Sequence, residues 1–153
     1  MTLTPSYTER LGVPLRWWVQ CVMLVAVLWL AVAVALPAVA AWVVTLVALA
    51  LTTFLLVLIG SPRVVVADGG FRAGRAHIGA EHLGPAVALD AEQTRRTAGV
   101  DADARAYLLL RPYLKRAVKV EITDPADPAP YWLVSTRRPE ELARALTALT
   151  HAR

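Results

Sequence analysis

Residues 17–62 read WWVQCVMLVAVLWLAVAVALPAVAAWVVTLVALALTTFLLVLIGSP and contain no charged side chain. A single helix of that length would extend about 69 Å, more than twice the ~30 Å hydrocarbon core of a bilayer. Pro37 divides the stretch into apolar runs at 17–36 and 38–59. Each run matches one bilayer crossing of roughly 20 residues. The stretch therefore predicts a transmembrane helical hairpin over residues 17–60.

A cleaved signal peptide is the main alternative for the first apolar run. Arg10 and Arg16 precede this run, and Ala-x-Ala triplets lie at 31–33 and 33–35. However, the run is longer than the ~7–15 residues of a signal-peptide core, and a second apolar run follows at once. A retained helix is the better interpretation.

Cations flank the apolar stretch on both sides, and the turn at 36–38 has none. The flanking cations are Arg10, Arg16, Arg63, Arg72 and Arg75. Short flanks rich in Lys and Arg stay in the cytoplasm. We therefore expect a multi-pass protein of the cell membrane with both termini cytoplasmic: an N-terminal segment at 1–16, the hairpin, and a domain at 61–153.

The charge composition of the domain argues against some kinds of partner. Residues 63–153 hold 14 Lys/Arg and 11 Asp/Glu, a mixed surface with a mild cationic excess. Nucleic-acid binding usually shows a denser cationic stripe and a recognisable reading motif, so no nucleic-acid partner is expected. The single cysteine, Cys21, excludes an intrachain disulfide and fits a reducing compartment.

The pattern after residue 60 changes from helical to strand-like. Strands are predicted at 63–67, 71–78, 86–89, 107–110, 118–123 and 131–135. Asp68-Gly69-Gly70 predicts a hairpin turn, and residues 91–97 a helical turn or loop. Because apolar and polar residues alternate at 118–123, this strand is expected to be half-buried and to pair antiparallel with 131–135.

A C-terminal amphipathic helix is predicted at 139–150. Pro139 suits its first turn, and the next two glutamates lie at the positive end of its dipole. One apolar face is formed by Leu142, Ala145, Leu146 and Leu149. Strands closed by one such helix indicate an α+β fold: a small, mostly antiparallel β domain, barrel or sandwich, with the helix packed on it.

Three stretches carry a resemblance that covers nearly the whole chain. They are YTERL at 7–11 before Trp17-Trp18, RVVVADG at 63–69, and RPY at 111–113 through YWLVSTRRPE at 131–140. Together they resemble a family of uncharacterised small two-helix membrane proteins of actinobacteria. The soluble half also resembles bacterial pleckstrin-homology-like domains, whose sheet ends in a strand followed by a capping helix. The resemblance implies the fold and the membrane location, and it assigns no activity or catalytic residue.

His77 and His82, with Glu81 between them, raise the possibility of a metal site. Zinc motifs place ligands one helical turn apart, as in H-E-x-x-H. Here the histidines are five residues apart, and Gly79 and Gly84 disfavour a helix. Two solvated loop histidines are the better interpretation, so no metal or cofactor is expected.

Two pairs of aspartates could be considered for acid–base catalysis. Asp124 and Asp127 lie in a Pro-rich connection, where Asp bonds its own backbone. Asp101 and Asp103 precede a possible helical turn and could cap it. Neither pair comes with a candidate nucleophile or base, so we expect no enzymatic activity.

A basic cluster offers a possible contact with lipid or a partner. Its members are Arg111, Lys115, Arg116, Lys119, Arg137 and Arg138. Near an anionic membrane each cation contributes about 1 kcal/mol. Glu121, Glu140 and Glu141 reduce the local potential, so an ordinary solvated face with paired charges is favoured over anionic-lipid contact.

These features predict a membrane-anchored, non-enzymatic interaction module at the cytoplasmic leaflet. Its expected partners are the lipid bilayer and an unidentified membrane or cytoplasmic protein. The alternative is an accessory subunit of a transporter or cell-envelope complex, contacted through the hairpin. Small side chains that would permit close helix approach are Ala31, Ala33, Ala35, Ala38, Ala40 and Ala41.

Overall fold

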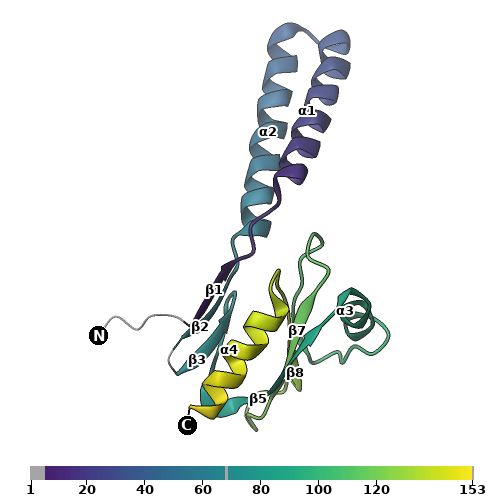
Figure 1. The fold of residues 1–153 in the computed structure, drawn as a ribbon. Coiled ribbons are helices and arrows are strands. Elements are labelled where there is room, and N and C mark those ends of the chain that lie inside the picture. Colours follow the sequence, from purple (N-terminus) through teal and green to yellow (C-terminus); the bar gives the residue numbers. More distant parts are fainter. Residues whose placement is uncertain (1–5, 68, 153) are drawn as a thin grey trace, which may run out of the picture. The chain divides into compact units, whose positions relative to one another are not determined.

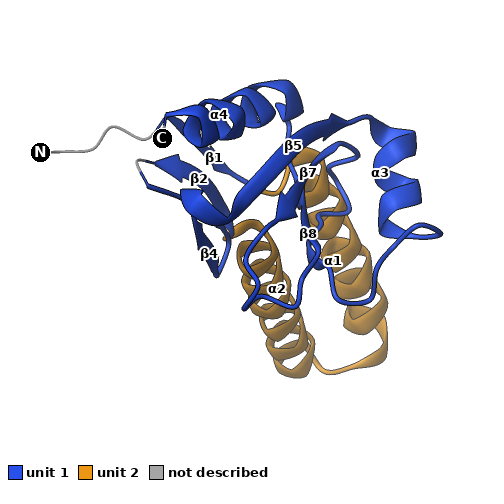
Figure 2. Ribbon diagram, turned by 90° about the horizontal axis from the view of Figure 1, so that it is seen from below, with its two compact units in different colours: residues 1–11, 62–153 blue, residues 12–61 orange. Residues whose placement is uncertain are grey.

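A computed structural model describes residues 6–67 and 69–152 and divides the chain into two units. One unit comprises Met1–Leu11 with Pro62–Arg153, and the other comprises Gly12–Ser61 (Figure 2). We refer to them as the domain and the helical unit. The helical unit is therefore an insertion in the chain of the domain.

The helical unit consists of α1 (Leu15–Ala35) and α2 (Ala38–Gly60) (Figure 1). Both helices are long and apolar enough to cross a membrane. They begin and end within two residues of the predicted runs. The break occurs where expected, because the residue before a proline is disfavoured in helical geometry, and Leu36 is extended.

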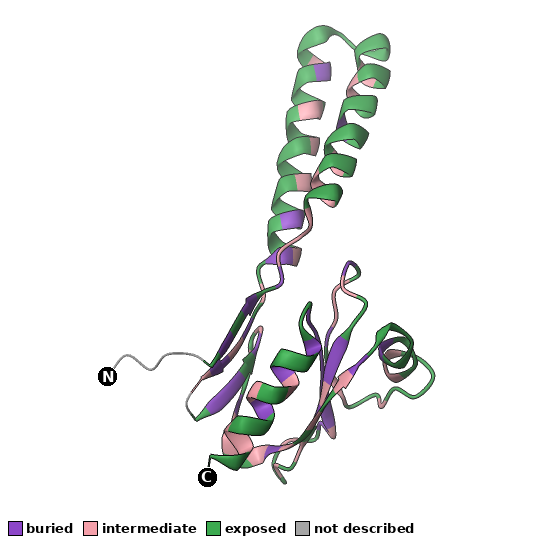
Figure 3. Ribbon diagram, in the orientation of Figure 1, coloured by how far each residue is buried: buried purple, intermediate pink, exposed green. Residues whose placement is uncertain are grey.

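The two helices pack on each other through few buried side chains. The Trp29 and Trp42 ring centroids lie 5.8 Å apart, and Val25, Ala41 and Leu56 are buried. Most other large apolar side chains of the unit are exposed (Figure 3). Such a continuous apolar surface is typical of a lipid or protein contact and not of a surface facing water.

The first sheet of the domain contains four antiparallel strands in sequence order. They are β1 (Tyr7–Arg10), β2 (Arg63–Ala67), β3 (Gly70–Ala73) and β4 (Ala76–Gly79). β1 pairs with β2 from Tyr7↔Val66 to Arg10↔Arg63.

Two predictions for this sheet are wrong. The prediction of a separate N-terminal segment at 1–16 is wrong for residues 7–10, because β1 belongs to the domain. The single strand predicted at 71–78 is two strands, since Gly74 has a φ of +64° and the chain reverses there. In the β2–β3 turn, Asp68 lies outside the described residues, and Gly69 has a φ of +92°.

The second sheet has the strand order β5-β7-β8-β6. Its strands are β5 (Leu83–Leu89), β6 (Tyr107–Leu109), β7 (Ala117–Ile122) and β8 (Tyr131–Ser135). The predicted antiparallel pairing of the strands now labelled β7 and β8 is confirmed, whereas β6 pairs parallel to β8. A short 3₁₀ helix, η1 (Ala80–His82), precedes β5.

Two helices pack on opposite faces of this second sheet. α4 (Pro139–His151) places Leu142 and Leu146 in the main core. α3 (Ala91–Ala98) lies beside a smaller cluster on the other face, formed around Tyr131 and Leu133 (Figure 2). The expected helical turn at 91–97 is thus a complete helix, begun by a capping box between Asp90 and Gln93.

Trp132 lies in the main core. It is 4% exposed, and its ring centroid lies 5.9 Å from Phe71 and 5.1 Å from Tyr107. All five residues of β8 are buried, because this strand is central in its sheet and both of its faces are covered. β8 therefore divides the domain into a large core under α4 and a small core beside α3.

Candidate functional site

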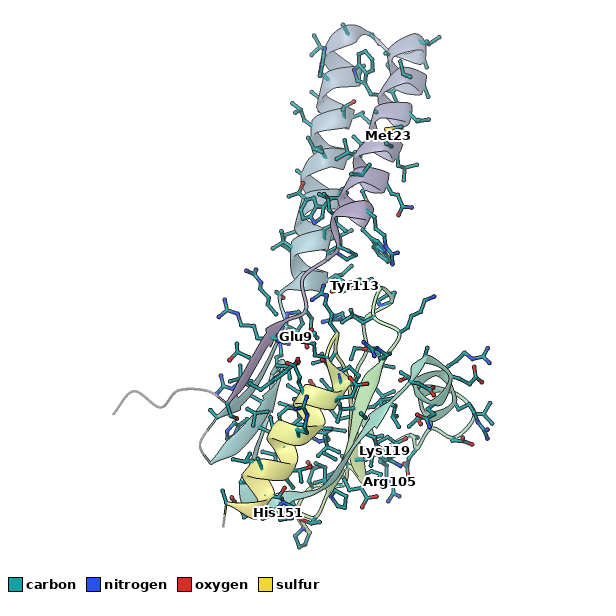
Figure 4. The ribbon with its side chains drawn as sticks, viewed as in Figure 1. Glu9, Met23, Arg105, Tyr113, Lys119 and His151 are labelled. Carbon is teal, nitrogen blue, oxygen red and sulfur yellow. The ribbon has the colours of Figure 1, made fainter. Side chains whose placement is uncertain are left out.

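The six cations of the predicted basic cluster do not form one patch. Lys119 lies on β7 with its ammonium 4.5 Å from the Tyr131 ring centroid, a cation–π contact. Because side chains alternate along a strand, Lys119 points away from the core that contains Val118 and Val120. Figure 4 shows Lys119 well separated from Glu9 on β1.

Three other cations lie at the end of β8 and are paired with acidic groups. The guanidinium of Arg116 lies 3.6 Å from Glu140, and that of Arg138 lies 3.0 Å from Glu141. Arg137 lies 3.7 Å from Glu9. The expectation of charge pairing thus holds for Glu140 and Glu141, and Glu9 is a partner that the sequence pattern does not indicate.

Glu9 is a buried carboxylate that accepts three hydrogen bonds. It is 5% exposed, and its Oε2 accepts from the hydroxyls of Tyr7 at 2.6 Å and Thr136 at 2.5 Å. Its Oε1 accepts from the backbone N–H of Arg137 at 3.0 Å. We call Tyr7, Glu9, Thr136 and Arg137 the Glu9 cluster. It fastens the strand that precedes the helical unit to the segment that follows β8.

Two tyrosines of this region have perturbed pKa values. Burial, with the hydrogen bond to Glu9, raises the pKa of Tyr7 to about 12. Arg138, whose guanidinium lies 5.5 Å from the Tyr7 ring centroid, acts in the opposite direction. Burial also raises the pKa of Tyr113, whose hydroxyl donates to the Leu11 carbonyl at 2.5 Å. Both phenols therefore stay protonated at neutral pH and serve as donors.

The two remaining predicted cations line a groove beside α3. This groove lies between α3 and the segment 110–115 and has a volume of about 800 Å³. Its charged lining residues are Glu92, Arg95, Arg111 and Lys115, and its apolar lining residues are Ala91, Ala98, Leu110, Pro112 and Leu114. We call it the α3 groove. Its volume falls within the ~300–1,000 Å³ typical of small-molecule sites.

Two buried polar atoms of the groove lining have no partner. Among the described residues, the buried side-chain polar atoms without a hydrogen bond are Thr94 Oγ1 and Arg111 Nε. Thr94 is 7% exposed. The backbone N–H of Arg111 donates to Ser135 Oγ at 3.1 Å, which holds the segment against β8. The α3 groove is thus lined by two residues that each carry a buried polar atom without a hydrogen-bond partner.

The two histidines considered for a metal site lie in β4 and in η1. Among residues 6–67 and 69–152, no three metal-ligating side chains gather where they could hold an ion. The prediction of two loop histidines is wrong for His77, which lies in β4, while His82 ends η1 with its Nε2 3.7 Å from Glu81.

The aspartates bond to nearby groups, as local turn and capping residues do. Asp124 and Asp127 each accept from a backbone N–H two residues ahead. Asp103 accepts from Arg105, whose side chain and backbone hydrogen bonds lower the pKa of that carboxyl. Asp101 forms an exposed ion pair with Arg96 at 3.4 Å.

Comparison with known proteins places the chain in a family. A family model described as "Protein of unknown function (DUF3093)" matches residues 6–146. The chain belongs to this family. Membership agrees with the predicted resemblance to an uncharacterised family, and the matched region includes both helices of the helical unit and both sides of the Glu9 cluster. No curated protein and no solved structure matches the chain.

Proposed function

We propose that the protein is a membrane-anchored, non-enzymatic binding module whose domain lies at the cytoplasmic leaflet. The observation that carries this proposal is the pairing of β1 with β2. These strands flank the helical unit in sequence and are hydrogen-bonded neighbours in the domain. Two membrane crossings between them return the chain to its starting side, as that pairing requires.

The charges support the cytoplasmic side for the domain. Arg10 and Arg63 are opposite each other in the β1–β2 register, one just before and one just after the apolar helices. The turn between the helices carries no cation. The excess of Lys and Arg in short flanks favours their retention in the cytoplasm.

The proposal includes a pleckstrin-homology-like fold for the domain and an actinobacterial origin for the protein. Two sheets with a C-terminal helix after β8 support the pleckstrin-homology-like interpretation of the domain. The parallel β6–β8 pair is a departure from the expected antiparallel arrangement. The actinobacterial resemblance remains part of the proposal.

Cysteine accessibility tests the topology. In a Cys21→Ser background, we expect Ser6→Cys and Ala152→Cys to resist a membrane-impermeant maleimide in intact cells and to react after lysis. Ala38→Cys, at the turn, should react in intact cells. Labelling of Ala152→Cys in intact cells would overturn the proposed orientation. Protection of Ala38→Cys would contradict a spanning hairpin and indicate a shallow one.

A hairpin deletion separates the module from the accessory-subunit alternative. The backbone N–H of Leu11 donates to the Pro62 carbonyl at 3.1 Å, so a short glycine-rich turn can join the two residues without residues 12–61. Crosslinking and mass spectrometry should then compare this variant with the full chain. Partners kept without the helices support the module, whereas partners lost with them support contact through the hairpin.

A further inference from the structure

The α3 groove combines a net positive lining with an apolar wall. Three cations, Arg95, Arg111 and Lys115, line it together with one carboxylate, Glu92. Arg95 already bonds Glu92, with Nη2 at 2.9 and 3.0 Å from the two carboxylate oxygens. Arg111 and Lys115 therefore supply the charge that remains for a ligand. Such a lining favours an anionic group.

The unpartnered atoms define what that group must offer. Arg111 Nε–H can only donate a hydrogen bond, and the Thr94 hydroxyl can donate one. The large majority of buried side-chain polar atoms have a partner, so two without one in a single groove lining are unusual. An oxyanion supplies acceptors for both. Binding then requires side-chain rotations that turn Thr94 Oγ1 and Arg111 Nε toward the groove.

The apolar wall calls for more than an inorganic anion. Leu110, Pro112 and Leu114 line the groove from one side and Ala98 from α3. These side chains offer no hydrogen bonds and gain from burying hydrocarbon, by about 25 cal/mol per Å². A ligand with both an oxyanion and an alkyl chain would use both parts of the lining.

We infer that the α3 groove binds a single-chain amphiphile with a carboxylate or phosphate head. The head accepts hydrogen bonds from Thr94 Oγ1 and Arg111 Nε, with Lys115 as a further cation. The chain lies along the apolar wall. This inference rests on the proposed binding function and gives it a ligand class, but it does not depend on the membrane orientation of the domain.

Equilibrium dialysis of the full chain in phosphatidylcholine nanodiscs tests the inference, with empty discs as the blank. The probes are radiolabelled octanoate and octyl phosphate. We expect dissociation constants of about 1 mM or below, the range open to ligands of this size. Octanol and inorganic phosphate should compete at least tenfold more weakly than the probes, because each lacks one half of the recognition.

Matched variants locate the binding. Thr94→Val and Arg111→Met should each weaken octanoate binding about tenfold, the usual loss for one hydrogen bond to a charged group. Lys115→Gln should weaken it severalfold. Thr147→Val on α4 and Lys119→Gln on β7, outside the groove lining, should change it less than twofold. Proteolytic resistance checks that each variant is folded, and Lys115→Gln changes an exposed side chain.

Several results would overturn the inference. If octanol competed as well as the probes, the groove would recognise only the alkyl chain. If inorganic phosphate competed as well as the probes, it would recognise only the anion. Equal losses in Lys115→Gln and Lys119→Gln would indicate diffuse surface charge. Loss of binding in discs that contain phosphatidylglycerol would assign the groove to a bilayer headgroup. Absence of octanoate binding with the expected cysteine labelling would refute the ligand and leave the membrane-anchored module in place.

Discussion

The Glu9 cluster and the α3 groove both bury polar side chains in the same domain, but only the Glu9 cluster gives each of them a partner. Glu9 accepts hydrogen bonds from Tyr7, Thr136 and the Arg137 backbone. Thr94, buried to a similar degree, has no partner for its hydroxyl. A satisfied polar network stabilises a fold, whereas an unsatisfied group costs free energy unless something binds it.

This difference in hydrogen bonding agrees with the segments of the chain from which each region is built. The Glu9 cluster joins residues 127 positions apart and holds β1, the strand that leads into the helical unit. The α3 groove is built from a short helix and the segment 110–115, whose Leu110 packs on the small core beside α3. The first region therefore secures the connection to the helices, and the second is free to serve recognition.

The largest loss of stability is expected from Trp132→Ala, which sets the scale for the polar sites. Removing this buried ring should cost about 3–5 kcal/mol of unfolding free energy. Pulse proteolysis in urea, on the full chain in nanodiscs, measures it. Trp42→Ala in the helical unit is the matched control and should leave the domain unchanged. A loss below 1 kcal/mol would contradict a core role for Trp132.

Glu9→Ala should cost about 3 kcal/mol by the same measurement. The change leaves the Arg137 N–H without its acceptor and deprives two hydroxyls of a charged partner, and breaking such a buried charged network is strongly destabilising. Glu121→Ala, an exposed glutamate on β7, is the control and should cost less than 0.5 kcal/mol, as is usual at the surface. Equal effects of the two changes would remove the distinction between the Glu9 cluster and ordinary surface charge.

The raised pKa of Tyr7 makes the Glu9 cluster sensitive to alkaline pH. The folded chain holds the phenolic proton up to a pKa of about 12, against the ordinary value of 10.0 for an unfolded chain. The stabilisation from this shift is therefore complete below pH 10 and is lost between pH 10 and 12. At its maximum it amounts to roughly 2–3 kcal/mol.

Tyr7→Phe isolates that titration from those of other groups. At pH 8 the variant should be less stable than the wild type by about 2 kcal/mol, because Glu9 loses a donor. The difference should shrink as pH rises from 10 to 12. Tyr131→Phe is the control, because Tyr131 lies in the small core beside α3 whereas Tyr7 lies in the main core. A Tyr7→Phe difference that stays constant over this range would contradict the raised pKa.

The elements that composition dictates could be predicted from the sequence. The uncharged stretch and Pro37 locate α1 and α2 within two residues, because each apolar run has the length and hydropathy that would suit one bilayer crossing. Alternation locates β7, and β8 has the predicted bounds. In both cases the signal is local and continuous.

The polar sites could not be predicted because they depend on tertiary contact. β1 has only four residues, and Glu9 occupies one of its two buried positions, so hydrophobic periodicity does not reveal it. Four of the six cations of the basic cluster lie within residues 111–119, yet strand alternation turns Lys119 away from the core under α4. The α3 groove joins α3, which ends at Ala98, to a segment that begins only at Leu110, a pairing with no sequence period.

The smallest effects come from one substitution made in both regions, threonine to the nearly isosteric valine. Thr136→Val should cost about 1–2 kcal/mol, because its hydroxyl donates to Glu9 and accepts from the Arg138 backbone. Thr94→Val should be neutral or slightly stabilising, because the hydroxyl it removes is buried without a partner. Pulse proteolysis of both variants, side by side, decides the matter. A loss at Thr94 equal to that at Thr136 would mean that the Thr94 hydroxyl is satisfied within the fold, and the α3 groove would then lose one of the two atoms reserved for a ligand.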